Sequence, residues 1–326
     1  MVDGIVLPLN CIDGMLVMAD GSVDAIVTDP PYGISFMGKR WDYDVPSVAM
    51  WAEALRVLKP GGYMLAFAST RTQHRMAVRI EDAGWEIRDM IAWVYGSGMP
   101  KHQSSLKPAL EPITLARKPA ERATLLNIDA CRVDTVSATD AATFENNHRV
   151  TERLPEHFKG RSLGLHDGGW KQKVGPAVIP PGRYPANLIH DGSDEVLAAF
   201  PSAPGQQGDL KETGRPRPSS GRFGDMPPPH AHAARIDETT SAARFFYCAK
   251  ASRSERGEDN NHPTVKPIAL MRYLCRLVTP TDGLILDPFA GSGSTGIAAK
   301  QEGFRFLGFE LDPAHAELAN GRIRNG

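Results

Sequence analysis

The sequence has few cysteines and no long hydrophobic segment. Its four cysteines, Cys11, Cys131, Cys248 and Cys275, are scattered without the spacing of metal ligands, so no metal site is expected. No apolar run is long enough to span a bilayer, and no signal peptide is recognisable. We therefore expect a reduced, cytoplasmic protein that makes no membrane contact.

The chain also lacks an excess of charge of either sign. Its 326 residues include 37 Lys and Arg against 38 Asp and Glu, a net charge of −1. No whole-molecule field would draw such a chain to nucleic acid, so any site for a polyanion must be a local patch. The 41% of hydrophobic residues is enough for one large core or two modest ones.

The pattern of apolar residues divides the chain into three parts. Strand-like and helix-like segments alternate over residues 1–118 and again over 245–326, which predicts an α/β fold. Strands are expected at 23–29, 61–69, 85–95, 112–118, 283–289 and 305–312, and helices at 47–62, 267–279, 293–303 and 313–325. Residues 119–244 are rich in Pro, Gly, Arg and His. We interpret them as a partly flexible insert that interrupts one sheet and carries specificity.

The stretch Asp29-Pro30-Pro31-Tyr32 follows the predicted strand at 23–29 directly. Two consecutive prolines cannot continue a hydrogen-bond ladder, so the chain must leave the sheet at Asp29. A carboxylate and an aromatic ring then stand on a stiff ledge at the carboxyl end of a strand, where open α/β sheets bind ligands. The alternative is a strand-end cap for Asp29 and a packed surface ring for Tyr32.

Residues 284–300 read as a strand, a glycine loop and a helix. Gly291 and Gly293 allow a ligand to approach the backbone, and no lysine follows until Lys300, which argues against a phosphate-binding loop. Asp287 suits a cationic ligand, and Glu310 at the end of the next strand is placed to bind a ribose. S-adenosylmethionine fits this description, although a tight turn between strand and helix remains the alternative.

Three stretches, "TDPPYG", "HPTVKP" at 262–267 and "DPFAGSGST", resemble the motifs of DNA amino-methyltransferases. Their order resembles the β group of that family, over residues 5–118 and 245–320. The resemblance implies a Rossmann-like S-adenosylmethionine-dependent methyltransferase fold with a mixed, mostly parallel seven-stranded sheet. That sheet would be circularly permuted, with a target-recognition region as the insert.

The resemblance also implies roles for individual residues. The Asp29 carboxylate and the Pro30 carbonyl would hold the target amine, and Tyr32 would stack on the flipped base, with Pro31 stiffening the ledge. Lys266 would pair with the cofactor carboxylate and Glu310 with its ribose, and no metal is needed. The cofactor-binding set is Asn10, Cys11, Asp29, Thr264, Lys266, Asp287, Phe289, Ala290, Gly291, Ser292, Gly293, Thr295, Glu310 and Asp312. Leu9-Asn10-Cys11 departs from the Gly-Asp before Cys that is common in the family.

Local positive charge indicates where DNA would bind. Residues 149–183 carry an excess of four basic residues and 211–222 an excess of three. Phosphate contacts require such patches, although solvated loops would look the same. The expected DNA-contacting residues are Lys171, Lys173, Arg215 and Arg217 in the insert and Lys39 and Arg40 after the ledge.

These features predict a site-specific methyltransferase that transfers a methyl group from S-adenosylmethionine to adenine N6 in duplex DNA after base flipping. The first Asp of the tetrad favours adenine in the family, and cytosine N4 is the alternative. Methylation of a protein amide and an inactive DNA-binding methylase fold are further alternatives. The resemblance implies a homodimer or a higher homo-oligomer. No nuclease motif is evident, so any restriction partner would be a separate protein.

Overall fold

The computed structural model describes residues 4–35, 38, 42–100, 106–121, 124–138, 140–141, 144–145, 181–202, 241–249 and 265–326. The chain forms two compact units. The larger one comprises residues 1–132, 184–196 and 246–326, and the smaller one comprises 133–183 and 197–245. Residues 119–132 and 184–196, which we expected in the insert, thus belong to the larger unit.

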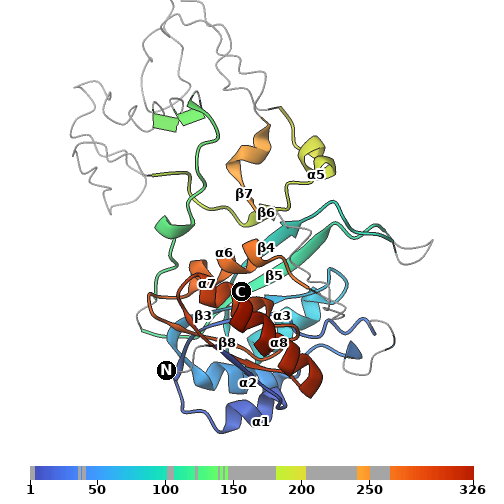
Figure 1. Ribbon diagram of the computed structural model, residues 1–326, viewed down its shortest axis with the longest axis vertical. Helices are drawn as coiled ribbons and strands as arrows, with labels where there is room; N and C mark the ends of the chain where they lie inside the picture. The colour runs from blue at the N-terminus through green and yellow to red at the C-terminus, as the bar shows by residue number, and fades with distance from the viewer. Residues whose placement is uncertain are drawn as a thin grey trace, which may run out of the picture. The chain divides into compact units, whose positions relative to one another are not determined.

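The larger unit is built on one sheet of nine strands among the described residues, in the order β1-β9-β8-β2-β3-β5-β4-β6-β7. All neighbouring pairs are parallel except those of β5, which is antiparallel to β3 and β4. This confirms the predicted α/β class with a mixed, mostly parallel sheet (Figure 1). The strands are β1 (Ile5–Leu7), β2 (Val23–Thr28), β3 (Leu58–Phe67), β4 (Glu86–Val94), β5 (Leu110–Arg117), β6 (Leu188–His190), β7 (Tyr247–Cys248), β8 (Leu284–Asp287) and β9 (Arg305–Phe309).

The sheet has two more strands than the seven that the resemblance implied. The short strands β6 and β7 extend it beyond β4, through parallel pairing of β6 with β4 and of β7 with β6. Their apolar pieces lie in or next to the Pro- and Gly-rich region, where the sequence pattern is too short to reveal a strand.

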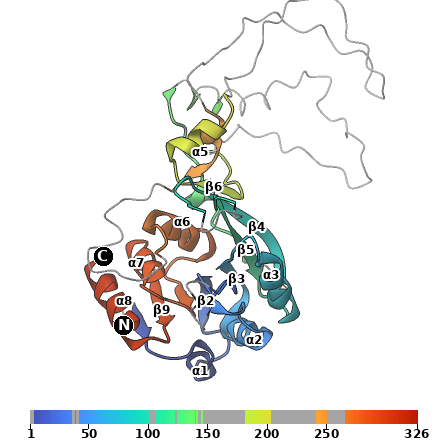
Figure 2. The same cartoon turned by 90° about the vertical axis from the view of Figure 1, so that its right-hand side faces the viewer.

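Helices cover both faces of the sheet. α6 (Ile268–Val278), α7 (Ser294–Gln301) and α8 (Pro313–Asn325) pack on one face, and α1 (Cys11–Leu16), α2 (Val48–Val57) and α3 (Gln73–Asp82) on the other, as Figure 2 shows. Alternate residues of β2 enter the two cores, Ala25 and Val27 on the α6 side and Ile26 on the α2 side. The helices expected at 267–279, 293–303 and 313–325 are confirmed. The short helix α5 (Asp194–Ala199) and 3₁₀ turns at Asp129–Cys131 and Ala242–Phe245 complete the described elements.

The prediction of a helix over 47–62 is wrong at its C-terminal end. The helix stops at Val57, and strand β3 begins at Leu58, before the expected stop at Pro60-Gly61-Gly62. Leu58 is fully buried and pairs with Val23 of β2, so sheet pairing overrides the helical pattern. The pairing then skips to Ala25 with Tyr63, which accommodates the proline and the two glycines in an irregularity.

The chain connections create a topological switch point between β2 and β8. From β8 the chain passes through α7 to β9 on one side, and from β2 it passes through α2 to β3 on the other. At such a switch point the loops that follow the two strands diverge, and ligands bind outside the strands' carboxyl ends. The Asp29 ledge and the glycine loop are the segments that follow these two strands.

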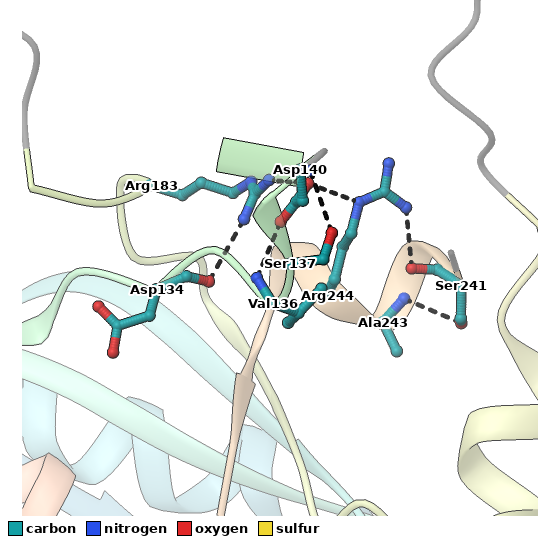
Figure 3. Close-up of polar contacts among 8 residues, drawn as sticks. All are labelled: Asp134, Val136, Ser137, Asp140, Arg183, Ser241, Ala243 and Arg244. Carbon is teal, nitrogen blue, oxygen red and sulfur yellow. Dashed lines mark hydrogen bonds and ion pairs between the residues drawn. The ribbon is translucent and has the colours of Figure 1, made fainter. Parts of the chain in front are cut away.

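Among the described residues of the smaller unit, a buried carboxylate joins three segments of the chain. Asp140, 4% exposed, forms an ion pair with Arg183, accepts a second hydrogen bond from Arg244 at 3.1 Å, and accepts a third from the Val136 N–H at 3.0 Å (Figure 3). Burial would raise the pKa of Asp140, but these hydrogen bonds and the charge of Arg183 lower it below its ordinary value. Arg183 and Arg244 also lie over the Phe245 ring. The cluster therefore ties together the segments around 136, 183 and 244.

Within the described residues, no helix is both long and apolar enough to cross a membrane.

Replacing Asp140 with Asn should destabilise the smaller unit, because it leaves the Arg183 charge buried without its counter-charge. Breaking a buried pair typically costs about 3–5 kcal/mol. Hydrogen exchange of the Val136 amide should accelerate, while amides of β2 and β3 keep their protection. The matched control is Asp129→Asn, because Asp129 pairs with Arg132 at the surface, where such a pair is worth about 0–1 kcal/mol. Equal exchange rates at Val136 in the wild type and Asp140→Asn would contradict this role.

Candidate functional site

A buried carboxylate fixes the backbone at the end of the Asp29–Tyr32 ledge by hydrogen bonds. Asp42, 1% exposed, accepts hydrogen bonds from the backbone N–H groups of Tyr32 at 2.6 Å, Gly33 at 2.9 Å and Ile34 at 3.3 Å. Gly33 has a φ of 67°, and a Cβ there would come within 2.9 Å of the Val45 nitrogen, so a glycine is required. The ledge is therefore rigid. The sequence carries no signal for Asp42, which looks like any acid of a surface loop.

The Asp29 carboxylate belongs to a network of four side chains. Its Oδ1 accepts a hydrogen bond from the Tyr32 hydroxyl at 2.6 Å, and its Oδ2 lies 2.8 Å from the Lys266 ammonium. Lys266 also lies 3.0 Å from Glu111 Oε2 and donates to the Tyr32 oxygen at 3.0 Å. The Tyr32 hydroxyl lies 3.3 Å from Glu111 Oε2. The structure thus brings the first and second motifs together at the carboxyl end of β2.

Charge and burial fix the protonation states in this network. Burial would lower the pKa of Lys266, but Asp29 and Glu111 raise it well above its ordinary value. Burial and the same two carboxylates raise the pKa of Tyr32. At neutral pH Lys266 is therefore an ammonium ion, and Tyr32 a neutral hydroxyl that donates. The ammonium also lies over the rings of Tyr32 and Phe67, at 5.4 and 4.8 Å.

Two contacts of the network were not part of the expectations. The expected pairing of Lys266 with the cofactor carboxylate stays a prediction; in the structure its ammonium, 7% exposed, pairs with Asp29 and Glu111. We also expected Tyr32 to act by its ring, yet its hydroxyl is hydrogen-bonded to Asp29.

Sequence reasoning missed Glu111, on strand β5. A signal exists, because Glu111 is an acid in the apolar run Leu110–Arg117, most of which is buried. An inward-facing charge in such a strand needs a partner. Tyr95 also engages it: burial, the Glu111 charge and a hydrogen bond to Glu111 raise the pKa of Tyr95 to about 12.

Asp287 joins the two strands of the switch point. Its Oδ1 accepts hydrogen bonds from the Thr28 hydroxyl at 2.6 Å and the Phe289 N–H at 3.1 Å, and its Oδ2 accepts one from the Thr295 hydroxyl at 2.6 Å. Burial raises the pKa of Asp287 to about 6, against the opposing effect of these hydrogen bonds. We expected this carboxylate to face a cationic ligand, but it is 1% exposed and used internally.

The glycine loop and Glu310 form one hydrogen-bonded unit. Gly291 and Gly293 have φ values of 50° and 80°, and a Cβ on Gly293 would lie 3.0 Å from the Ala319 Cβ. Glu310, which follows β9, accepts the Gly291 N–H at 3.0 Å through Oε2 and the Asp312 N–H at 2.9 Å through Oε1. The half-buried Glu310 carboxylate is therefore held against the loop, as the sequence places it.

Several expected cofactor residues have structural partners. Ser292 and Thr295 are buried, with Ser292 accepting from Arg322 at 2.8 Å. Asn10 and Asp312 cap the first turns of α1 and α8.

Cys11 and the rest of the loop complete the expected set. Burial raises the pKa of Cys11 to about 11, so it is a neutral thiol rather than a nucleophile. Ala290 is buried, and Phe289 packs half-buried against the core on the α2 side.

The remaining expected residues lie outside the described part of the chain. They are Thr264 for the cofactor and Lys39, Arg40, Lys171, Lys173, Arg215 and Arg217 for DNA, so their roles stay predictions. Across the described ranges, no group of three or more His, Cys, Asp or Glu side chains could hold a metal ion.

Comparison with known proteins assigns the family. A family model described as DNA methylase, which covers N6 and N4 enzymes, matches residues 23–321. The chain belongs to this DNA methylase family. It is 37% identical over 75 residues to the type II methyltransferase M.ScaI of Streptomyces caespitosus, a match that covers 23% of the chain and 24% of M.ScaI. The match to M2.LlaDCHI of Lactococcus lactis likewise spans 24% of that protein.

Solved structures share the fold of this DNA methylase family member. The PvuII cytosine-N4-specific DNA methyltransferase aligns with a TM-score of 0.52 at 16% identity, over 99% of this chain and 86% of that one. The complex of M1.HpyAVI with SAM aligns with a TM-score of 0.50 at 18% identity, over 98% of both chains. At these identities the likeness shows the fold alone.

The raised pKa of Asp287 predicts that its contribution to stability depends on pH. The folded state holds the proton more tightly than the unfolded chain, so this contribution is largest below pH 4 and is lost as the pH rises through about 6. The difference in unfolding free energy between the wild type and Asp287→Asn should fall over this window by on the order of 1–3 kcal/mol. Urea denaturation at a series of pH values measures it. A difference that grows with pH would contradict the assignment.

Proposed function

We propose that this chain is an S-adenosylmethionine-dependent DNA methyltransferase that modifies the exocyclic amine of adenine at N6. The observation that carries the proposal is the position of the Asp29 carboxylate on a rigid ledge after β2, next to the glycine loop that follows β8. Membership of the DNA methylase family supports the class of reaction. The relatives named above are themselves methyltransferases.

The glycine loop fits S-adenosylmethionine as the methyl donor. Gly291 leaves the backbone open beside the half-buried Glu310 carboxylate, which can accept hydrogen bonds from ribose hydroxyls. No lysine stands in the loop to bind a phosphate. The M1.HpyAVI structure of the same fold was solved as a SAM complex. Bound at this loop, the cofactor would supply an electrophilic methyl group.

The ledge residues would activate and orient the amine. The lone pair of an exocyclic amine is delocalised into the base, so the nitrogen is a weak nucleophile. The Asp29 carboxylate and the Pro30 carbonyl would accept hydrogen bonds from its two hydrogens and direct the lone pair to one side. The amine loses one proton in the reaction, and Asp29 is the carboxylate placed to receive it. Because the amine lies within the duplex, the base would be flipped out and would stack on the Tyr32 ring.

Cytosine N4 is the second candidate target, because the same ledge geometry suits either amine. The PvuII enzyme, which shares the fold, is described as cytosine-N4-specific. The Asp at the first position of the tetrad favours adenine by resemblance to the family. Contacts to the DNA backbone would come from Lys39, Arg40, Lys171, Lys173, Arg215 and Arg217. The protein would act in the cytoplasm as a homodimer or a higher homo-oligomer.

Transfer of a tritiated methyl group into DNA tests this function. We expect label in duplex DNA, recovered as N6-methyladenine after digestion to nucleosides, and its loss in Asp29→Ala. Label recovered as N4-methylcytosine would select the second candidate. Label in protein but not in DNA, or equal labelling by Asp29→Ala, would contradict the proposal.

The role of Glu310 predicts a loss of cofactor affinity on substitution. Removing a hydrogen-bonding carboxylate costs about 1.5–3 kcal/mol, so Glu310→Ala should bind S-adenosylmethionine roughly 10- to 150-fold more weakly in calorimetry. Glu317→Ala, which removes an exposed carboxylate of α8, is the control and should bind as the wild type does. Unchanged affinity in a folded Glu310→Ala variant would exclude the ribose contact.

A further inference from the structure

The ammonium of Lys266 has an oxygen partner for each of its hydrogens. A lysine ammonium carries three N–H donors. Oxygens of Asp29, Glu111 and Tyr32 lie 2.8, 3.0 and 3.0 Å from the Lys266 nitrogen. With three acceptors at hydrogen-bond distance, Lys266 is locked in the network rather than free to bind a ligand.

The formal charges of this network leave one negative charge over. Asp29 and Glu111 carry one negative charge each, and Lys266 carries one positive charge. Without Glu111, the ammonium would pair with Asp29 alone and the pair would be neutral. A neutralised carboxylate is a weaker acceptor for an amine that becomes positively charged as it is methylated.

The position of Glu111 suits it to this balancing role. It lies on β5, which pairs on both sides, with β3 and β4, and residue 111 pairs with Trp93 of β4. Its Oε2 contacts Lys266 at 3.0 Å and lies 3.3 Å from the Tyr32 hydroxyl. Tyr95 engages the same carboxylate. A side chain held on a paired strand by several partners keeps its charge beside the ammonium.

We propose that Glu111 is a positioning residue for methyl transfer, which shares the Lys266 ammonium with Asp29 and thereby leaves Asp29 with enough negative charge to accept the target amine. The proposal rests on the proposed function. It concerns residues of this chain only, and Glu111 itself touches neither the amine nor the methyl donor.

The first test is Glu111→Gln, which keeps the shape of the side chain and removes its charge. We expect kcat to fall roughly 10- to 100-fold, since Asp29 acts on the transition state. The KM and the calorimetric affinity for S-adenosylmethionine should stay within about twofold of the wild type.

Glu302→Gln is a matched control. Glu302 also bridges two cations, Arg272 at 2.6 Å and Arg276 at 2.8 Å, and contacts none of the ledge residues in its described interactions. Its loss should lower the thermal midpoint and leave kcat unchanged. If kcat falls equally in Glu111→Gln and Glu302→Gln, the effect of Glu111 is a general loss of stability, and the proposal is overturned.

The decisive variant removes the ammonium as well. In Lys266→Gln with Glu111→Gln, Asp29 regains a full negative charge, so kcat should recover at least several-fold from the Glu111→Gln value. A purely structural role predicts the opposite, that the double variant is worse than either single one. Either that result or a Glu111→Gln variant with wild-type kcat would overturn this proposal and leave the proposed function standing. A wild-type chain that methylates no DNA overturns the proposed function and this inference together.

Discussion

The candidate site depends on the hydrogen bonds of one buried carboxylate, Asp287. Its bond to Thr28 joins two strands that lie 259 residues apart in the sequence, and its bond to Thr295 ties both to α7. The carboxyl ends of β2 and β8 are thereby held next to each other, so the ledge and the glycine loop start from neighbouring strand ends. Burial raises the pKa of Asp287, because the charged carboxylate loses its contact with water. Its hydrogen bonds to Thr28, Thr295 and Phe289 offset part of this penalty and keep the two strand ends together.

The acids around the switch point have different tasks because their surroundings differ. Asp287 and Asp42 are buried and fully used by hydrogen bonds from the chain itself, so they shape the site. Asp29 and Glu310 are only partly buried and can accept hydrogen bonds from a ligand. Lys266 lies between Asp29 and Glu111 and compensates part of their negative charge without removing all of it. We infer that the negative charge left on Asp29 allows the rigid ledge to stabilise the positive charge that develops on the target amine.

The sequence predicted most of the strands and helices of the larger unit, because their apolar periods are long and end at proline or glycine. It also placed Asp29, Gly291 and Glu310 at the ends of their strands, where simple chain geometry puts them. The sequence could not predict the roles of Glu111 and Asp42, because these roles arise only when β5 and the loop after Gly33 come next to the ledge in the folded chain. The early end of α2 at Val57 could not be predicted either, because it depends on the pairing of Leu58 with Val23, which is distant in the sequence. The internal use of Asp287 likewise depends on Thr28, which no local pattern identifies.

A crystal structure of the wild-type protein with duplex DNA and a non-transferable analogue of S-adenosylmethionine would test the central claim most directly. We expect the target amine to lie within hydrogen-bond distance of the Asp29 carboxylate and the Pro30 carbonyl, while Lys266 stays between Asp29 and Glu111. A Lys266 ammonium turned to the carboxylate of the analogue, with the target amine away from Asp29, would contradict it.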